Sequence, residues 1–566
     1  MKKVSLLFFT ILAAVLFLNT PLAAAQTDSQ ANNANRNFQR IIPLTSPIYR
    51  EMDRLYLLAG KSRPSLSRPW SADEARKIFE ALPENFLDTV PASAALIKRE
   101  IGFGNENTGP RQMAFKVSPE INIAANVKIN NDRKEWEHGY EARPPLLNIP
   151  LEFWFFPNVY ANMEFAQRHD YAIIESNRYF TNISFNPADY DWNTPFRAFL
   201  SVGGEHWNIQ AGRDRVSWGA GVTGNLMISD YSDFFNKVRI TTYWRRFKFT
   251  YVYMGLEPWL TRQEEGFRDT VGNEFRWSGP FEDFGERFKA HLGKRIEIRI
   301  LDNLTFAISE SSMFGNRYIN LSELNPVMYW HNLFTPEYSN VMMGFDIDFT
   351  PFPGLNIYLQ IAIDEFENSG GKPRAWAYLG GVTYVRQTTE GFLTFNLEGA
   401  IVEPYMYNRW HPNTRFTNRR RIMTRQVEGG QDFVNKPIGY RHGPDSVIIY
   451  GAVHYERPGR YMAGISVRYA LLGAWNDSLD YAGTYPDEGE RGVGLLSGIV
   501  ERNLVVGLHG RMQLTDRISL ASDIYYVRIH NYQPPPARGG RAERPERTSG
   551  TNITDLEFTG SVRIRF

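Results

Sequence analysis

Apolar and polar residues alternate with a period of two along most of the chain after Phe115. Ile296, Ile298 and Ile300 alternate with charged residues, and residues 354–363 place five aliphatic side chains at every second position. Side chains two positions apart share one face of a strand, so each segment has an apolar face and a polar face. A β-sandwich and a membrane barrel with a wet lumen both contain such strands.

The links between the strands separate these two folds. About 18 strands are predicted between residues 115 and 566, and short and long links alternate strictly. Links 157–158 and 203–205 are short, whereas 213–237 and 402–445 are long. Outer-membrane barrels have short periplasmic turns and long extracellular loops. The pattern therefore predicts an all-β transmembrane β-barrel of about 18 antiparallel strands at residues 111–566, with both ends of the chain in the periplasm.

Residues 46–110 have a helical pattern. Ser46-Pro47 and Ser71–Glu74 mark two helix starts, and the second is a capping box that satisfies free backbone N–H groups. A third helix is predicted from about Pro91 to Ile101. Three short helices bury too little apolar surface to fold alone. We therefore expect a small N-terminal α-helical periplasmic segment that packs against the rim of the barrel.

The first 25 residues have the pattern of a secretory signal peptide. Lys2 and Lys3 precede an apolar run from Val4 to Leu18, and small residues follow up to Ala25, where cleavage is expected. Residues 26–45 are mostly polar and predict a flexible lead-in. The protein is thus expected to be exported and to lie in the bacterial outer membrane.

Composition narrows the classes of function. The mean hydropathy of −0.39 is too polar for a bundle of membrane helices, each of which needs about 20 apolar residues. The net charge of +1 favours neither nucleic acid nor an anionic membrane surface. The sequence has no cysteine, which excludes disulfides, cysteine-based zinc sites and a lipid anchor on cysteine. Aromatic residues make up 14%, which fits both the Trp and Tyr girdles of a barrel and a sugar-binding surface.

The segment Gly212–Gly224 combines four glycines with Arg213, Arg215 and Trp218. A guanidinium donates hydrogen bonds to hydroxyl and carboxylate groups, and an indole ring stacks on the C–H face of a sugar. These three side chains are therefore candidates for a polysaccharide site. A tight turn at the barrel rim, in which glycine supplies the curvature, explains the segment equally well.

The predicted loop 402–445 is strongly basic. Residues 404–445 include eight Lys or Arg residues against three Asp or Glu residues, and Arg419, Arg420 and Arg421 are consecutive. Such a loop suits an anionic polymer or a phosphorylated lipid head group. A solvated loop, or one neutralised by the acidic loop 471–493, is the alternative.

No motif identifies an enzyme. The 10 histidines show no H-x-x-x-H spacing, and the sequence contains neither a G-x-S-x-G motif nor a P-loop. We therefore expect no catalytic residue, no cofactor and no metal site. The alternative to a polysaccharide-binding barrel is a porin or solute channel, because barrels of this size admit water unless they are filled. Its lumen would be lined by Arg239, Arg245, Lys248, Glu297 and Arg563.

Several short motifs resemble the capsule assembly Wzi family of outer-membrane proteins. They are Asp53–Leu58, Arg68–Ser71, Gly212–Arg213, Trp218–Gly221, Leu321–Pro326, Ser339–Asn340, Gly344–Asp346 and Asp364–Glu365. The resemblance extends over about residues 45–566. It implies a barrel with a periplasmic helical bundle that acts as a lectin for capsular polysaccharide. The expected partners are a surface polysaccharide and outer-membrane lipid, and no nucleic acid.

Overall fold

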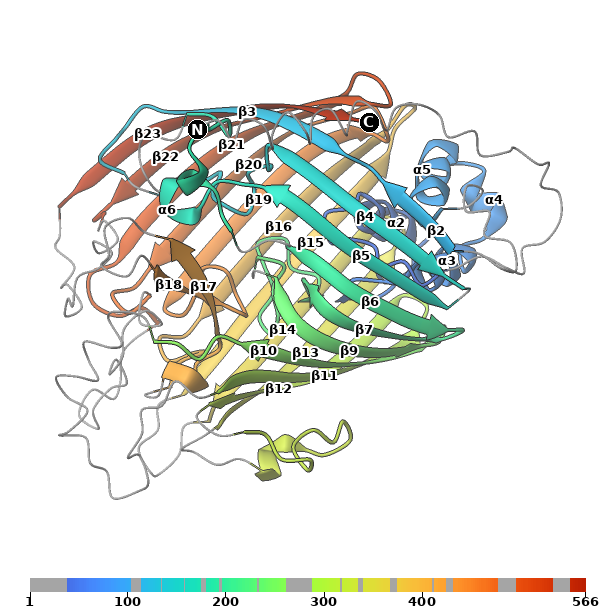
Figure 1. Ribbon diagram of the computed structural model, residues 1–566, viewed down its shortest axis with the longest axis horizontal. Helices are drawn as coiled ribbons and strands as arrows, with labels where there is room; N and C mark the ends of the chain where they lie inside the picture. The colour runs from blue at the N-terminus through green and yellow to red at the C-terminus, as the bar shows by residue number, and fades with distance from the viewer. Residues whose placement is uncertain are drawn as a thin grey trace. The chain divides into compact units, whose positions relative to one another are not determined.

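Eighteen antiparallel strands form a closed barrel in the computed structural model (Figure 1). The first strand consists of β2 (Met113–Val117) and β3 (Glu120–Lys128), which both pair with β4 (Leu147–Phe155). Pro119 separates the two parts, because proline has no N–H to donate to the ladder. The barrel closes where β23 (Asn552–Arg565) pairs with β3.

The other barrel strands lie close to the predicted segments. They are β5 (Val159–Gln167), β6 (Arg197–Gly204), β7 (Trp207–Asp214), β9 (Phe235–Tyr243), β10 (Phe247–Leu256), β11 (Lys289–Leu301), β12 (Leu304–Gly315), β13 (Ser339–Phe352), β14 (Leu355–Glu365), β15 (Ala375–Gln387), β16 (Phe392–Val402), β19 (Ser446–Arg457), β20 (Tyr461–Leu472), β21 (Glu501–Gln513) and β22 (Ile518–His530). Two small ladders are not part of the barrel wall. One pairs β1 (Ser67–Arg68) with β8 (Ser217–Trp218), and the other pairs β17 (Thr417–Met423) with β18 (Gln431–Pro437). The second ladder lies inside the predicted loop 402–445, for which no strand was expected.

The structure describes residues 38–102, 113–133, 135–156, 158–174, 180–192, 196–231, 234–260, 288–315, 318–333, 339–366, 374–409, 412–423, 431–476, 495–532 and 550–566. The predicted signal peptide and most of the predicted lead-in lie outside these residues. Within these ranges, no helix is both long and apolar enough to cross a membrane.

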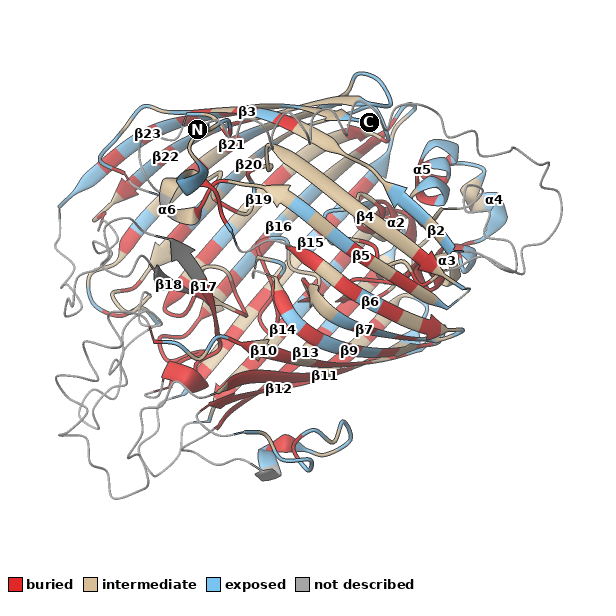
Figure 2. Cartoon of the chain, viewed as in Figure 1, coloured by how far each residue is buried: buried red, intermediate tan, exposed pale blue. Residues whose placement is uncertain are grey.

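The two faces of the strands differ in polarity and burial (Figure 2). Ile298, Leu359 and Phe558 are 42%, 39% and 43% exposed, as expected for side chains on the outer face of the barrel. Asp346 and Thr559, on the inner face, are each 4% exposed. The predicted assignment of faces is therefore confirmed, and the outer face is an apolar belt around the barrel.

Short and long links lie at opposite ends of the barrel (Figure 1). The short ones are tight turns, and Gly354 and Gly459 adopt φ values of +88° and +71° that favour glycine. We call this end the short-turn end and the opposite end the long-loop end.

The three predicted helices are confirmed as α2 (Ile48–Leu58), α3 (Ala72–Glu80) and α5 (Pro91–Ile101). The Ser71 hydroxyl caps α3 by accepting a hydrogen bond from Glu74 N at 3.2 Å. Short helical turns also occur, namely α4 (Glu84–Leu87), α6 (Tyr171–Ile174), η2 (Pro187–Asp189), η3 (Trp330–Leu333) and η4 (Pro412–Thr414).

The N-terminal helices pack at the short-turn end of the barrel (Figure 1). Their apolar core includes Val385 of β15 and Phe392 of β16. The helices were expected to pack against the rim. The segment between α2 and α3 continues past the rim into the lumen, where Ser65 and Ser67 contact inward side chains of the wall. We refer to residues 38–102 as the plug.

A lysine substitution should distinguish the two faces of β23. We expect Phe558→Lys to lower the free energy of unfolding by about 2–4 kcal/mol, because the ammonium group would lie in the lipid. Ser561→Lys, on the inner face of the same strand, should cost much less. Urea titrations of both variants in lipid vesicles measure the difference, and equal losses would contradict the assignment of faces.

Candidate functional site

A segment from the long-loop end folds into the lumen and meets the plug. In this segment, residues 215–229, which we call the inner loop, Ser217 and Trp218 pair with Arg68 and Ser67 of the plug. Gly219 N donates a hydrogen bond to Leu66 O at 2.9 Å. The plug and the inner loop thus enter from opposite ends and join inside the barrel.

Trp218 is a core residue of this junction. Its side chain is 1% exposed and belongs to an apolar cluster with Val216 and Met227. The ring packs directly on Gly293 of β11, where an added Cβ would lie 2.7 Å from Trp218 Cη2. Glycine at position 293 therefore makes room for the indole ring.

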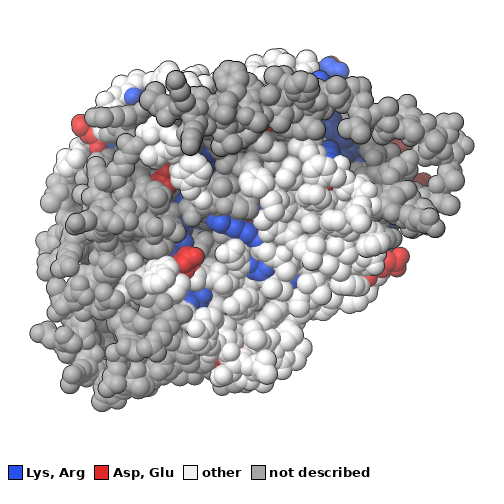
Figure 3. All heavy atoms as spheres, viewed as in Figure 1, with Lys and Arg blue, Asp and Glu red and all other residues white. Residues whose placement is uncertain are grey.

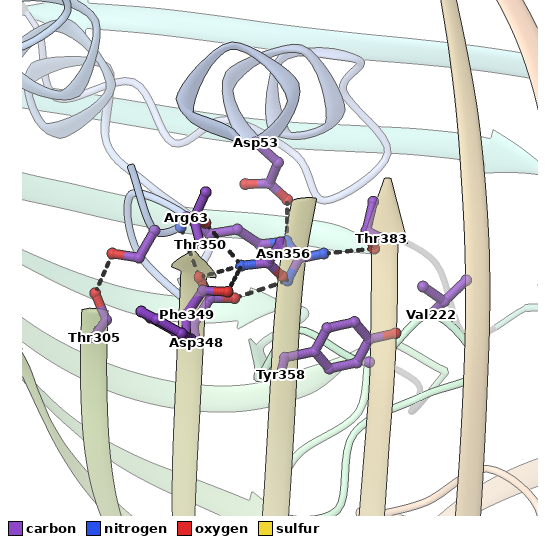
Figure 4. A network of polar contacts seen from close by, with 12 residues as sticks. Asp53, Arg63, Val222, Thr305, Asp348, Phe349, Thr350, Asn356, Tyr358 and Thr383 are labelled. Carbon is purple, nitrogen blue, oxygen red and sulfur yellow. Dashed lines mark hydrogen bonds and ion pairs between the residues drawn. The ribbon is translucent and has the colours of Figure 1, made fainter. Parts of the chain in front are cut away.

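Arg63 connects the plug to the barrel wall (Figure 4). Its guanidinium donates hydrogen bonds to Asp348 Oδ2 at 2.8 Å, to Asn356 Oδ1 at 2.5 Å and to Thr383 Oγ1 at 3.0 Å. Its backbone N–H donates to the other Asp348 oxygen, Oδ1, at 2.8 Å. Asp348 is fully buried, so this pairing removes the large cost of an isolated charge in the lumen.

Glu398 of β16 holds the tip of the inner loop in the same way. Its carboxylate accepts hydrogen bonds from Val222 N at 2.7 Å and Thr223 N at 2.8 Å. The Tyr358 hydroxyl also donates to it, at 2.6 Å, while Arg63 lies 4.9 Å from the Tyr358 ring centroid. Tyr358 therefore links the plug contact to the inner-loop contact.

The charged residues expected to line a pore mostly serve this packing. Lys248 donates to Ser67 O at 2.7 Å, and Glu297 accepts from the Ser67 hydroxyl at 2.7 Å. Arg239 is 2% exposed and donates to Pro69 O. These three residues do not line an open channel, whereas Arg245 and Arg563 keep exposed side chains.

Tyrosines and cations gather at the long-loop end. The guanidinium carbons of Arg168 and Arg420 lie 4.2 Å and 4.0 Å from the Tyr140 ring centroid. Lys436 Nζ lies 4.9 Å from the Tyr171 centroid and 5.5 Å from the Tyr231 centroid, and Arg441 lies 4.8 Å from Tyr231. We call these seven residues, which come from four different loops, the tyrosine–cation cluster.

Two carboxylates brace the cluster. Asp191 accepts a hydrogen bond from the Tyr140 hydroxyl at 2.7 Å and pairs with Arg420, while Glu141 pairs with Lys436. Tyr171, Tyr231 and Arg441 remain partly exposed. Figure 3 shows Lys and Arg side chains gathered near the centre of the face in view, with few carboxylates beside them.

Two histidines in these loops, His138 and His169, are uncharged near neutral pH. Burial lowers the pKa of His138 to about 4 and that of His169 to about 4. These two imidazoles therefore add no positive charge to the cluster near pH 7.

The structure places the six predicted binding residues in different surroundings. Arg420 belongs to the tyrosine–cation cluster, and the buried Arg419 donates to Asn413 Oδ1 at 2.6 Å. Trp218 lies in the lumen core and has no exposed ring face. Arg213 is partly exposed at the end of β7, and the Arg215 guanidinium lies 4.6 Å from the Phe234 ring centroid. Only the backbone of Arg421, paired with Phe433, is described. A binding role for these residues stays a prediction.

Sequence reasoning missed the tyrosines of the cluster. Tyr140, Tyr171 and Tyr231 come from three predicted long loops and have no shared motif. The interleaving of Tyr and Arg in those loops was the available signal. No group of three metal-ligating side chains occurs in the part of the chain that the structure describes.

Removing the Arg63 side chain should loosen the plug. Arg63→Met leaves Asp348 as a buried, unpaired charge, which typically costs about 3–5 kcal/mol. We expect faster proteolysis of residues 38–102 in the folded protein, and partial recovery when Asp348→Asn is added. Lys61→Met, which removes a more exposed ion pair with Asp302, is the control. Equal cleavage of all variants would contradict this role of Arg63.

Comparison with known proteins agrees with this architecture. The family model of the capsule assembly protein Wzi matches residues 107–433. The barrel is similar to Wzi from Escherichia coli, with a TM-score of 0.57 and 12% identity over 93% of this chain and 99% of that one. That structure is described as an outer-membrane protein involved in group 1 capsule assembly and as a carbohydrate-binding β-barrel.

Two other solved structures give lower TM-scores. OccD3 from Pseudomonas aeruginosa has a TM-score of 0.39 and 8% identity over 81% of this chain and 94% of that one. The anion-selective porin of Comamonas acidovorans has a TM-score of 0.35 and 9% identity over 80% and 100% of the two chains. No curated protein sequence matches the chain. The family model covers more than half of the chain, and the likeness to E. coli Wzi confirms the predicted barrel fold. The protein is an outer-membrane β-barrel that belongs to the capsule assembly protein Wzi family.

Proposed function

We propose that the long-loop end of the barrel binds a surface polysaccharide and holds it at the cell surface. The observation that carries this proposal is the filling of the lumen from both ends. With the plug and the inner loop held against the wall, a long polymer meets a loop surface rather than a through-channel. The short-turn end, with the plug helices, then faces the periplasm. Holding the polymer requires no bond to be made or broken, so the binding is not enzymatic.

Family membership supports this proposal, since the E. coli relative is described as carbohydrate-binding. The chemistry of the tyrosine–cation cluster supports it as well. Guanidinium groups donate to hydroxyl and carboxylate oxygens, and aromatic rings offer faces for the C–H groups of a sugar. Four cations against two carboxylates favour an acidic polymer.

The residues of the cluster have two roles in this proposal. Tyr231 and Arg441 are partly exposed and would contact the polymer. Arg420 and Lys436 are buried with Asp191 and Glu141 and would hold the loops in place. Of the residues predicted from the sequence, Arg215 remains a candidate for direct contact, whereas Trp218 would act by holding the inner loop.

Conductance tests the filling of the lumen. The wild-type protein in planar bilayers should conduct far less than an open barrel of similar strand number. Glu398→Ala should raise the conductance, because it releases the tip of the inner loop. Glu390→Ala, at an exposed short turn, is the control and should change nothing. A large steady conductance of the wild type would favour the porin alternative.

Glycan retention tests the cluster. Cells with Tyr231→Ala and Arg441→Gln should lose surface polysaccharide, at equal levels of folded protein in the outer membrane. The contribution of Arg441 should weaken in salt, because the Debye length falls from about 10 Å at 0.1 M to about 3 Å at 1 M. Retention should not change between pH 6 and 8, since His138 and His169 are uncharged there. Arg457→Gln, at the short-turn end, is the control. Unchanged retention in the double variant would exclude this site.

A further inference from the structure

The lumen is not filled uniformly. Along β10–β16 the inward side chains are mostly buried by the plug and the inner loop, whereas along β20–β22 several remain partly exposed. The His509 side chain is 21% exposed and that of Arg511 is 40% exposed. Leu508 and Ile524, next to His509 and Asp523 in sequence, are exposed on the opposite, outer face. This part of the wall therefore faces water inside the barrel.

Three polar residues on this wall lie in a line. Ser466 Oγ is 2.8 Å from His509 Nε2, and His509 Nδ1 is 2.8 Å from Asp523 Oδ1. They come from the neighbouring strands β20, β21 and β22. His509 and Asp523 are direct partners in the ladder, whereas Ser466 lies opposite Gly507.

The carboxylate of Asp523 determines which atom donates and which accepts in each of these hydrogen bonds. An ionised carboxylate can only accept hydrogen bonds, so His509 Nδ1 must be the donor. In a neutral imidazole, Nε2 is then the acceptor, and the Ser466 hydroxyl donates to it. Arg511 also donates to the second oxygen of Asp523 at 2.8 Å, which keeps the carboxylate ionised and in place.

Glycine at position 507 permits the contact between Ser466 and His509. A Cβ added there would lie 2.8 Å from Ser466 Oγ and 2.8 Å from His509 Nε2. Any side chain at this position would therefore push the two groups apart. Gly464, which lies opposite His509, makes room for His454 in a similar way. A Cβ added at position 464 would lie 3.0 Å from the Cβ of His454.

We propose that Ser466, His509 and Asp523 form a hydrolytic site for small, water-soluble carboxylic esters. Serine, imidazole and carboxylate in this order are the parts of a nucleophilic acyl-transfer site. Ser466 and His509 are the catalytic residues, and Asp523 and Gly507 are positioning residues. This activity is distinct from polysaccharide binding and departs from the expectation that the protein is not an enzyme.

The reaction balances with water as the co-substrate. Ser466 Oγ bonds to the ester carbonyl carbon while its proton passes to His509 Nε2. The carbon–oxygen bond to the alcohol breaks, and the alcohol leaves with that proton. Water then attacks the acyl-serine and gives a proton to Nε2, which returns it to Ser466 Oγ as the carboxylic acid departs.

The surroundings indicate which esters fit. The site faces the wet lumen and not the lipid, so a short acyl group is favoured over a fatty acyl chain. Arg468, two residues from Ser466 on the same face, pairs with Glu137 at 2.7 Å, and Arg511 pairs with Asp523 at 2.8 Å, so the wall beside the site is polar and its charges are balanced.

A serine-directed probe tests the proposal on the full-length protein folded in detergent micelles. A fluorophosphonate should label the wild type, and peptide mass spectrometry should locate the label on Ser466. The protein should also hydrolyse p-nitrophenyl acetate, and faster than p-nitrophenyl palmitate. Ser466→Ala and His509→Gln should lower that rate by roughly 100-fold or more, as is usual when the nucleophile or base is removed.

Two further variants separate catalysis from structure. Gly507→Ala should lower the rate by displacing the ring, while Ser561→Ala, another inward serine, should leave it unchanged. Heat-modifiable migration on gels reports that each variant is folded. The absence of label on Ser466 in the folded wild type, or a folded Ser466→Ala variant with the wild-type rate, would overturn the proposal. Faster hydrolysis of the palmitate would overturn the assignment to short esters. Because the labelling needs no glycan, its outcome is independent of the polysaccharide tests.

Discussion

The barrel depends on pairing the charges that its strands point inward. A barrel of this size has a lumen that its own side chains cannot fill. The inward charges must therefore be either wet or paired, and a buried carboxylate without a partner costs several kcal/mol. Asp348 obtains its partner from Arg63 of the plug, and Glu398 obtains donors from the backbone of the inner loop. The wall, the plug and the inner loop are thus one unit.

This constraint divides the lumen into two parts. On the side of β9–β16, Lys248, Asp348 and Glu398 contact segments that enter from an end, and Arg239 is likewise buried against the plug. On the side of β20–β22 the neighbouring strands supply the partners, as Asp523 does for Arg511, and water can remain. Residues of the same type thus have opposite exposure because their partners come from different parts of the fold.

Alternation predicted most of the strands because an inner and an outer face impose the same period on each of them. The alternation pattern failed where a strand packs on other protein segments and does not have one face in lipid and the other in the lumen. β11 begins at Lys289, five residues before the predicted start. Its first residues pack on Trp218 and on the β17–β18 ladder, so they do not have one face in lipid and the other in water. The ladder itself was missed, since the consecutive arginines 419–421 have no alternation to detect.

The candidate sites were less predictable because their members are distant in sequence. Trp218 was expected to offer an exposed ring, but its position is decided by Gly293, which leaves a space that only the folded barrel creates. Ser466, His509 and Asp523 have no local motif. Their geometry follows from the register of β20, β21 and β22, which pattern alone does not specify to the residue.

Several of the motifs that resemble the Wzi family lie in the plug, in the inner loop and in the wall around them. Asp53 pairs with Arg68 inside the plug, Trp218 packs on Gly293, and Asp346 pairs with Arg295 in the wall. None of these side chains belongs to the tyrosine–cation cluster. The family resemblance therefore reflects the filled barrel, whereas the proposed choice of glycan depends on loop residues outside those motifs. Members with the same junction and different clusters would then hold different polymers on the same frame.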